Sequence, residues 1–314
     1  MMKELGIPPE KTIHTHPIKR TQDIEAGLEY GVKTFVVDSM HEIAKLALYR
    51  DHMNVLLRLS FRSLHVSADL SYRFGAPPEQ AMEYLQAARD AGITVRGLCF
   101  HTGSNAMLPI KMVEAVRVSR QIFDLAAEED IHMWTLDIGG GFPVPSHGAV
   151  LSAKSYAEPV LELLNAHFPD TEILAEPGRF ISAHSMTLLS SVMGRSTRSG
   201  INWVTLDTGV YSGYSGNTYD AQEPILIPIQ SLREAAISGE PLQSILAGSR
   251  GEPTFPTIVA GPTCDAGDVV RDGILLPELD TGDVLISPTM GAYSYAHMTS
   301  FNHFPPPRIV QARW

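Results

Sequence analysis

The sequence predicts an α/β fold, built on a parallel sheet and followed by a mainly β domain. In residues 1–185 short apolar runs alternate with helical patterns, and this repeated strand-then-helix order favours parallel strands joined by crossover helices. The predicted strands are Thr12–His16, Thr34–Asp38, Val55–Ser60, Val95–His101, Trp134–Ile138 and Glu172–Glu176. Nearly all of them end in a polar residue or a glycine, and chemistry at the C-terminal ends of parallel strands is typical of the (β/α)8 barrel. The pattern also permits an open doubly wound sheet.

Helical patterns fill the stretches between these strands, for example Pro78–Ala91 and Met112–Glu129, where apolar residues recur at three- and four-residue spacing. The count is six strand-helix units, whereas a closed barrel of this type has eight. An incomplete barrel leaves two sheet edges unpaired. We therefore expect this chain alone to aggregate and to have weak or no activity.

The character of the sequence changes near Ser185, where helical periodicity fades and Gly, Pro, Ser and Thr punctuate short β-rich runs. We place one domain at residues 1–185 and a second, mainly β domain at 186–314. The predicted strands of the second domain are Met186–Val192, Trp203–Asp207, Pro224–Pro228, Thr257–Ala260 and Asp283–Ile286. The segment Gly239–Gly251 is predicted to be a mobile loop.

Composition narrows the class of protein. The 314 residues carry a formal net charge of -11, which argues against a nucleic-acid partner because such partners select a basic face. No apolar run reaches the ~20 residues of a membrane helix, and the N-terminus does not have the pattern of a signal peptide. Cys99 and Cys264 are the only cysteines, so a reducing compartment is favoured over a disulfide framework. We expect a cytoplasmic protein with no metal site.

Gly139-Gly140-Gly141 directly follows an apolar strand. Consecutive glycines leave backbone N–H groups unshielded and permit the dihedral angles of an anion-binding nest, for which phosphate is the natural ligand. A tight turn without a ligand explains the same run equally well.

Glu176-Pro177-Gly178-Arg179 follows the next predicted strand. A carboxylate in this place can pair with a ring nitrogen and keep it protonated, and Gly178 and Arg179 can add to a phosphate site. A Glu beside a Pro is, by itself, more often a helix or turn cap. Its position one strand-helix unit after the glycines favours the functional interpretation.

His101 and Ser104 lie at the end of another predicted strand. A strand-end imidazole can stack on an aromatic cofactor, and a nearby hydroxyl can bind phosphate. The alternative is a buried histidine with only a structural role.

Three segments of the second half are ambiguous when taken singly. Cys264 follows Gly261-Pro262 in a loop, where a thiol can donate a proton. Tyr219-Asp220 offers a carboxylate for a cationic substrate end, although loop aspartates are usually solvated turn formers. Tyr293 supplies a phenol near the C-terminus.

In this order, the motifs resemble those of ornithine decarboxylase and its relatives among the fold-type III pyridoxal-phosphate enzymes. The matching segments run through essentially the whole chain: residues 16–19, 36–39, 100–104, 136–143, 176–179, 219–220, 261–265, 291–293 and 300–302. The resemblance implies an alanine-racemase-like (β/α)8 barrel followed by a β domain. It also implies pyridoxal 5'-phosphate as the cofactor and a homodimer with shared active sites.

The same resemblance assigns roles to residues. His101 would stack on the pyridoxal ring and Glu176 would pair with its nitrogen. Cys264, reaching across from the partner subunit, would protonate the carbanion left by carbon dioxide. The residues that would complete the cofactor site are Arg58, Ser104, Gly139, Gly140, Gly141, Pro177, Gly178, Arg179 and Tyr293. Those that would bind the distal amine of the substrate are Tyr219, Asp220 and Asp265.

The chain departs from the family at its N-terminal side. There, the lysine that binds the cofactor as a Schiff base lies on the first barrel strand, upstream of the segment that matches residues 5–11. None of the seven lysines occupies that motif, and the two missing strands agree with the count of six. Lys19 lies just past a strand end, but it matches a non-catalytic lysine of the relatives.

We therefore expect a decarboxylase of basic amino acids, acting on L-ornithine to give putrescine for polyamine biosynthesis. The Gly-Pro-Thr-Cys-Asp form of residues 261–265 favours a terminal ammonium over a second carboxylate in the substrate. Ala260 and the 266–268 run differ from the relatives, which leaves the exact amino acid open. The alternatives are a catalytically dead homologue that acts as a regulatory partner, and one half of a split enzyme.

Overall fold

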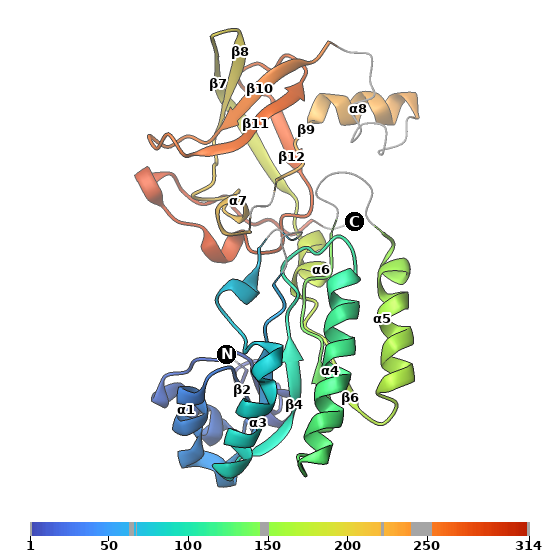
Figure 1. Cartoon of the computed structure of the whole chain (residues 1–314). Helices are drawn as coiled ribbons and strands as arrows, with labels where there is room; N and C mark the ends of the chain where they lie inside the picture. The colour runs from blue at the N-terminus through green and yellow to red at the C-terminus, as the bar shows by residue number, and fades with distance from the viewer. Residues whose placement is uncertain are drawn as a thin grey trace. The chain divides into compact units, whose positions relative to one another are not determined.

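The computed structural model describes residues 2–62, 66, 68–144, 151–220, 223–239 and 253–312. The chain forms two compact units (Figure 1). Unit 1 comprises Met1–Phe142 and Leu151–Pro177, and unit 2 comprises Pro143–Val150 and Gly178–Trp314. The boundary at 185/186 remains a prediction from the sequence. The predicted loop at 239–251 lies, apart from Gly239, outside the described residues.

Unit 1 contains a six-stranded parallel sheet in the order of the sequence. Its strands are β1 (Ile13–His14), β2 (Thr34–Val37), β3 (Asn54–Leu59), β4 (Thr94–Phe100), β5 (Thr135–Asp137) and β6 (Glu172–Leu174). All six predicted strands are therefore confirmed within two residues at each end. In the described part of the chain β1 and β6 are the edges of this sheet, which is a curled half-barrel of the predicted class rather than a doubly wound sheet with permuted strand order.

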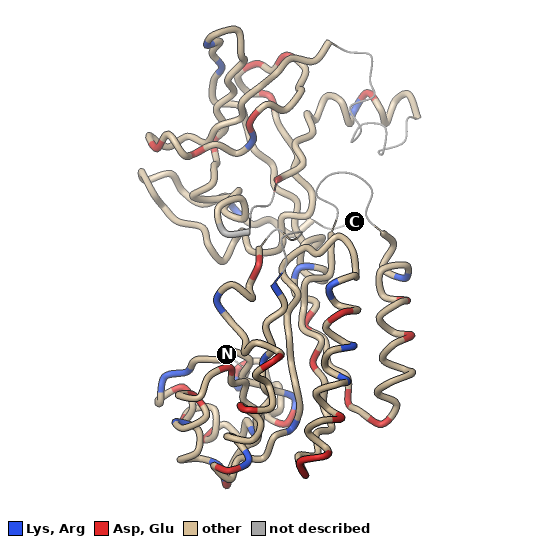
Figure 2. The backbone as a smooth tube through the Cα atoms, viewed as in Figure 1, with Lys and Arg blue, Asp and Glu red and all other residues tan. Residues whose placement is uncertain are grey.

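Five helices connect these strands and cover one face of the sheet. They are α1 (Thr21–Tyr30), α2 (Met40–Leu46), α3 (Ala81–Asp90), α4 (Ile110–Glu128) and α5 (Ala153–His167). The two predicted helical segments are confirmed as α3, with a 3-10 turn at Pro78–Gln80 before it, and as α4. Acidic and basic residues alternate along these helices (Figure 2). On α4, Arg120 and Asp124 form an i,i+4 ion pair.

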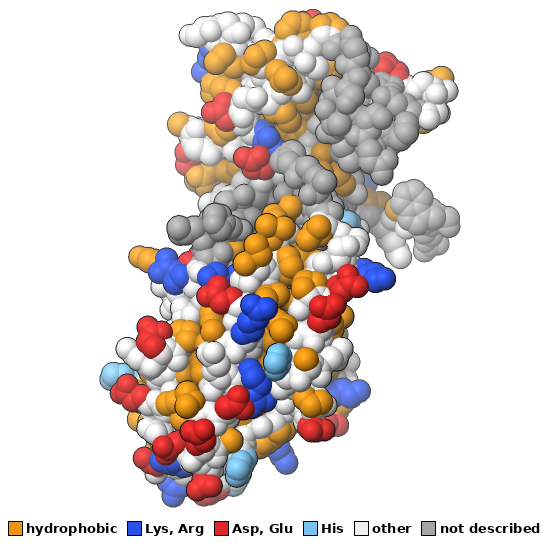
Figure 3. All heavy atoms as spheres, turned by 45° about the vertical axis from the view of Figure 1, so that its right-hand side comes forward, with side chains coloured by type: hydrophobic (Ala, Val, Ile, Leu, Met, Phe, Trp, Pro, Cys, Tyr) orange, Lys and Arg blue, Asp and Glu red, His pale blue; other side chains and the backbone are white. Residues whose placement is uncertain are grey.

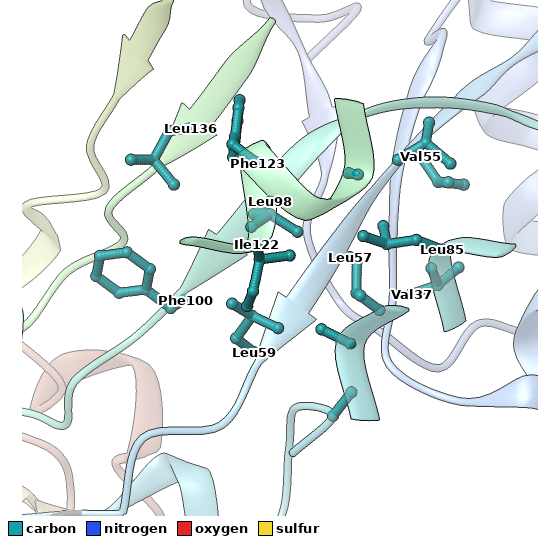
Figure 4. Close-up of a cluster of buried hydrophobic side chains, with 14 of the residues drawn as sticks. Val37, Val55, Leu57, Leu59, Leu85, Leu98, Phe100, Ile122, Phe123 and Leu136 are labelled. Atoms are coloured by element: carbon teal, nitrogen blue, oxygen red, sulfur yellow. The ribbon is translucent and has the colours of Figure 1, made fainter. Parts of the chain in front are cut away.

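The main core of unit 1 lies between the sheet and these helices. Figure 4 shows Val37, Leu57 and Leu98 of the strands packed with Leu85 of α3 and Ile122 of α4. Because side chains alternate across a strand, the intervening residues point to the opposite face. A smaller cluster there joins Ile13, Val36, Leu56 and Cys99. The strands are thus apolar on both faces at mid-height, as expected for a parallel sheet.

A polar network closes this opposite face at the N-terminal ends of the strands, with Arg96 of β4 at its centre. The Arg96 guanidinium donates to Thr34 Oγ1, to Thr135 Oγ1 (3.0 Å) and to Glu172 Oε2 (2.6 Å). Thr135 Oγ1 in turn donates to the Glu172 carboxylate (2.8 Å). One side chain therefore connects strands β2, β4, β5 and β6.

Unit 2 contains a mixed six-stranded sheet in the order β11-β10-β8-β7-β12-β9. The strands are β7 (Leu188–Arg198), β8 (Ile201–Leu206), β9 (Ile227–Pro228), β10 (Phe255–Ala260), β11 (Val269–Leu276) and β12 (Val284–Ser287). Of these described strands, β10 and β8 pair in parallel and the other neighbours pair antiparallel. The core of this sheet includes Val204, Leu206, Tyr214, Val259 and Leu285.

The sequence pattern missed strand β11 and predicted none of the helices that the structure describes in unit 2. Strand β11 is interrupted by Arg271-Asp272-Gly273, and Gly273 has a φ of +68°, so its apolar residues do not alternate regularly. Helix α8 (Ile229–Ser238) directly follows Pro228 and buries only Ser231 and Ala235, so it lacks a clear apolar stripe. The short helices α6 (Gly178–Ser182) and α7 (Gly216–Asp220) complete the unit.

The surface carries exposed apolar side chains among charged ones, as the face drawn in Figure 3 shows. On α4 and α5 they include Ile110, Leu125 and Leu161. Within the described residues, no helix combines the length and the apolar content that a bilayer crossing requires.

Replacing Arg96 with Ala tests the network at the base of the sheet. The change leaves the Thr34 and Thr135 hydroxyls and the Glu172 carboxylate without their cation, so we expect a loss of about 2 kcal/mol in the free energy of unfolding. Urea denaturation followed by circular dichroism measures it. Arg89→Ala is the matched control, because the ion pairs of Arg89 with Asp90 and Glu129 and its hydrogen bond to the Glu129 carbonyl oxygen (2.9 Å) lie on the surface, so the change should cost less than about 1 kcal/mol. Equal losses for the two variants would contradict the role given to Arg96.

Candidate functional site

The parallel register brings three strand-end side chains of unit 1 into one row. Arg58 of β3 is the partner of Cys99 of β4, and Cys99 is the partner of Asp137 of β5. The Arg58 guanidinium also lies over the Phe74 ring, 5.1 Å from its centroid. A cation and a carboxylate therefore flank a buried thiol at the C-terminal edge of the sheet.

Asp137 shapes the turn that follows β5. Its Oδ1 accepts a hydrogen bond from the Gly139 N–H (2.8 Å), and burial raises the pKa of the carboxyl group. The same burial raises the pKa of the Cys99 thiol, to which the Asp137 charge adds. Cys99 is thus an inert core thiol.

The three glycines pack tightly against neighbouring loops. A Cβ added to Gly139 would lie 2.0 Å from the Phe100 carbonyl oxygen, one on Gly140 would lie 2.5 Å from the Glu176 carbonyl oxygen, and one on Gly141 would lie 2.2 Å from the Gly103 carbonyl oxygen. Gly139 and Gly141 also have φ values of +66° and +99°. Close packing and backbone geometry therefore both require glycine here. This requirement alone is what a tight turn without a ligand would also show.

The same turn also presents unused donors. Among the described residues, the backbone N–H groups of Gly140 and Gly141 have no hydrogen-bond acceptor, although Gly140 is buried. The Thr102 hydroxyl is buried without a partner, and its Oγ1 lies 3.5 Å from where a Gly141 Cβ would be. Buried donors of this kind are normally satisfied. Their chemistry fits a small oxyanion such as a phosphate group.

His101 lies beside the glycine turn as a neutral imidazole. Its Nδ1 accepts from the Gly103 N–H (3.0 Å), which places the proton of the neutral ring on Nε2. Desolvation, with a smaller contribution from the Arg58 charge, lowers the pKa of His101 to about 4. The Nε2 atom is 3.0 Å from the position that a Gly140 Cβ would occupy.

Glu176 follows β6, and its backbone N–H donates to the Gly139 carbonyl oxygen (2.8 Å). The carboxyl group keeps access to solvent while protein atoms crowd it on other sides. Partial desolvation and then the Asp137 charge raise the pKa of Glu176 to about 7, against the opposing effects of Arg58 and of a hydrogen bond from Thr15. Glu176 can therefore bind or release a proton near neutral pH.

Two other predicted residues of unit 1 lie on the same side. The Ser104 N–H donates to the Ala68 carbonyl oxygen (2.9 Å), which fixes the loop after β4. Pro177 separates Glu176 from the start of unit 2. Unit 1 thus brings Arg58, His101, Ser104, the glycine turn and Glu176 to one edge of its sheet.

Unit 2 gathers Gly178, Arg179 and Tyr293. The buried Arg179 guanidinium lies over the Tyr293 ring, 5.0 Å from the centroid, and burial lowers its pKa. A Cβ on Gly178 would lie 3.2 Å from the Tyr293 hydroxyl oxygen. Tyr293 has a φ of +55°, an uncommon conformation for a bulky residue, so its backbone is held by its surroundings.

A second cluster of unit 2 contains Cys264 and Asp265. The exposed Cys264 Sγ lies 3.5 Å from both Oδ1 and Nδ2 of Asn302. Asp265 accepts from the Tyr211 hydroxyl and from the Gly267 N–H (2.7 Å), and these two hydrogen bonds lower the pKa of its carboxyl group. Asp265 is therefore ionised at neutral pH.

Tyr219 and Asp220 lie at the end of helix α7. The structure places their backbone only, so their substrate-binding role remains a prediction.

The sequence did not predict the contacts of several residues at these sites. Thr15, Thr102 and Asp137 were seen only as parts of strand ends, and Tyr211 and Asn302 carried no signal of their own. Their contacts join segments that lie far apart in the chain, such as Cys264 with Asn302 and Tyr211 with Asp265. A search for polar residues one or two positions from each predicted strand end would have found the first three.

Lys19 has a structural role. Its buried Nζ donates to the carbonyl oxygens of His16, Pro17 and Val36, at 3.2, 3.0 and 2.7 Å, and lies 3.7 Å from Glu42 Oε1. Desolvation is the main cause that lowers the pKa of Lys19 to about 8. These hydrogen bonds join the loop after β1 to strand β2.

Comparison with known proteins gives a consistent result. Residues 1–183 match the profile of the family described as "Pyridoxal-dependent decarboxylase, pyridoxal binding domain". The chain is 35% identical over 305 residues to "Lysine/ornithine decarboxylase" of Selenomonas ruminantium, covering 97% of this chain and 72% of that protein. It is 28% identical to "Antizyme inhibitor 2" of Xenopus laevis, covering 97% and 66%. The crystal structure of lysine/ornithine decarboxylase complexed with putrescine from Vibrio vulnificus superposes with a TM-score of 0.82 at 39% identity, covering 97% and 76%.

The His101 environment predicts a pH-dependent stability. In the unfolded chain the imidazole has its ordinary pKa of 6.5, whereas in the folded chain its pKa is about 4. Between these values the unfolded state binds more protons, so this histidine makes the protein more stable as pH rises from 4 to 6.5. His101→Asn keeps an acceptor for the Gly103 N–H and should flatten the rise in unfolding free energy across this window. Parallel curves for the two proteins in urea titrations at several pH values would contradict the assignment.

Proposed function

Because the chain belongs to the family of pyridoxal-dependent decarboxylases, with a half-barrel and a β domain that match the fold of its relatives, we propose that it decarboxylates L-ornithine to putrescine. The family supplies the broader statement: these are carboxy-lyases that use pyridoxal 5'-phosphate on basic amino acids. The observation that carries the proposal is the pair of adjacent N–H groups at Gly140 and Gly141, which have no acceptor in the described part of the chain and lie beside a neutral His101.

The donor set fits the cofactor. The residues that would hold its phosphate are Ser104, Gly139, Gly140, Gly141, Gly178, Arg179 and Tyr293. Arg58 and His101 would line the ring, and Glu176 would face the ring nitrogen. When bound, pyridoxal phosphate supplies the electron sink that accepts the electron pair of the bond to the departing carboxylate.

The protonation states in unit 1 suit these roles. An uncharged His101 can lie flat against an aromatic ring without adding a buried charge. Glu176, with its pKa raised to about 7, can share a proton with a ring nitrogen at working pH. Asp137 adds to that effect from the neighbouring strand and holds the Gly139 N–H.

The residues of unit 2 suit substrate binding and proton return. Cys264 would give its proton to the carbon that has lost carbon dioxide, because a loop thiol exposed to solvent can donate and be reprotonated. Asp265, held ionised by Tyr211, would pair with the distal ammonium of the substrate, together with Asp220. A carboxylate in this position favours a basic amino acid over one with a second acidic end.

We further propose that the protein acts as a homodimer, as its resemblance to the family implies. We also propose that it is cytoplasmic, because both cysteines are free thiols, as expected in a reducing compartment. A second candidate function is a non-catalytic partner of a complete decarboxylase, or one half of a split enzyme. One observation favours this candidate. Among the described residues, the amine of Lys19, which follows a barrel strand, donates its hydrogen bonds to backbone carbonyl oxygens, so it is not placed to bind the cofactor as a Schiff base. The likeness to an antizyme inhibitor supports the same candidate.

Substrate preference tests the leading proposal. Protein purified from its native source, together with any polypeptide that accompanies it, is supplied with pyridoxal phosphate and given L-ornithine, L-lysine, L-arginine or meso-diaminopimelate. The released carbon dioxide and amine are quantified. We expect putrescine from ornithine as the fastest reaction and no turnover of diaminopimelate. Turnover of diaminopimelate alone would overturn the assignment of Asp265. A preparation that binds the cofactor and turns over none of the four would favour the non-catalytic partner.

Replacing Cys264 with Ala isolates the proton-return step. We expect amine formation to fall by about 100-fold, the order of a lost general acid, while cofactor affinity is unchanged. Amine release and cofactor titration are measured on the same preparation. A loss of cofactor affinity instead would contradict the role of Cys264.

The intact mass of the protein from its native source separates the remaining alternatives. A mass well above 34.3 kDa, with a lysine-bearing N-terminal peptide that borohydride links to the cofactor, would support an ordinary decarboxylase. A mass of 34.3 kDa would support a partner protein or a split enzyme. Co-purification of a small lysine-bearing polypeptide would then identify the split enzyme.

A further inference from the structure

Asn302 is the hydrogen-bond partner that the structure gives the Cys264 thiol. Both polar atoms of the amide, Oδ1 and Nδ2, lie 3.5 Å from Sγ, within the range of a hydrogen bond to sulfur. The two residues are 38 positions apart in the chain, so their contact is made by tertiary structure.

The turn that carries Asn302 is built to present this side chain. Asn302 has φ 55° and ψ 22°, the left-handed conformation that asparagine tolerates better than most residues. Two hydrogen bonds to the Tyr211 carbonyl oxygen, from the Thr299 N–H (2.9 Å) and Oγ1 (3.0 Å), anchor the start of the turn. The Phe301 ring packs on the Tyr211 ring with their centroids 4.7 Å apart.

The loop that carries Cys264 is anchored to the same residue. The Tyr211 hydroxyl donates to Asp265, the neighbour of Cys264. On the other side, the buried Asp268 carboxylate accepts from the Thr263 N–H (3.0 Å), from Thr263 Oγ1 (2.7 Å) and from the Val210 N–H (2.8 Å). Tyr211 and its neighbour Val210 therefore fix the loop at Thr263 and at Asp265, on both sides of the thiol.

We propose that Asn302 is the positioning residue of the Cys264 proton donor. An amide both accepts and donates, so Oδ1 can accept from the S–H group and Nδ2 can donate to the sulfur once the proton has left. The proton moves from Sγ to the substrate carbon, and solvent water then reprotonates the thiolate. This inference rests on the proposed function, in which Cys264 is the donor.

Alkylation kinetics provide a test that does not depend on turnover. The rate of reaction of the purified protein with iodoacetamide is measured across pH by intact mass spectrometry, with Cys264→Ala as the background for the buried Cys99. Asn302→Asp keeps the size of the side chain but places a carboxylate 3.5 Å from the sulfur. We expect alkylation near neutral pH to slow by about five-fold and the midpoint of the pH curve to move upward, because the carboxylate disfavours the thiolate.

Two further variants separate positioning from a structural effect. Asn302→Gly retains the left-handed backbone and removes the amide, so its midpoint should also move upward, by less than that of Asn302→Asp. His303→Gly is the matched control, since His303 has a φ of +61° in the same turn, and among the described residues the hydrogen bonds of the thiol go to Asn302 and not to His303. We expect it to follow the wild-type curve. Wild-type curves for both Asn302 variants would overturn the inference.

The distribution of products separates this inference from the proposed function. In an active preparation, the amount of amine formed per molecule of carbon dioxide released is measured. This ratio should fall in both Asn302 variants, toward the value that Cys264→Ala gives. If Cys264→Ala leaves amine formation unchanged, the donor role itself fails. If Cys264→Ala impairs amine formation and the Asn302 variants do not, the donor role stands and the positioning role of Asn302 is wrong.

Discussion

The register of the parallel sheet is the constraint on which the rest of unit 1 depends. Strand order follows the sequence, so each strand adds its C-terminal end to the same edge. The pairing of Arg58 with Cys99, and of Cys99 with Asp137, then brings charged groups together that lie tens of residues apart. A shift of one residue in any of these strands would turn the row toward the helices and place apolar side chains in the site.

The face that carries this row is layered along the strands. Arg96 and its partners close the N-terminal end, Val36 and Leu56 fill the middle, and the row of Arg58, Cys99 and Asp137 lies at the C-terminal end. The apolar middle layer removes water from beneath the edge, and this desolvation is the main reason why the pKa of His101 falls and that of Glu176 rises. The core of the half-barrel thus sets the chemistry of its rim.

Much of this architecture was predictable from the sequence. The elements that were missed have irregular patterns or little burial, and the missed contacts join distant loops. Strands β2, β3 and β5 are short apolar runs with polar ends, and β4 is an apolar run interrupted by Arg96 and Gly97, so the pattern located them. Strand β11 was missed because Gly273 breaks its alternation, and α8 because it buries so little. Roles for Glu176 and Cys264 came from the order of several motifs, since neither residue is informative alone. Asn302 belongs to the matching segment 300–302, but its contact with Cys264 could not be predicted. Tyr211 lies in none of the matching segments, and its contact with Asp265 likewise joins loops that lie far apart in the chain.

The two units shift the pKa values of their ionisable groups in opposite ways. In unit 1 desolvation disfavours the charged forms of His101 and Glu176, so the pKa of His101 is lowered to about 4 and that of Glu176 is raised to about 7. In unit 2 Asp265 is exposed, and hydrogen bonds from Tyr211 and Gly267 favour its ionised form. A flat aromatic ring with an anionic phosphate suits the first environment, where uncharged faces and N–H donors meet. A mobile substrate ammonium suits the second, since a hydrated carboxylate can bind and release a cation without the cost of burying it. The opposite pKa shifts thus support the proposal that unit 1 binds the ring of the cofactor and that Asp265 of unit 2 binds the basic end of the amino acid.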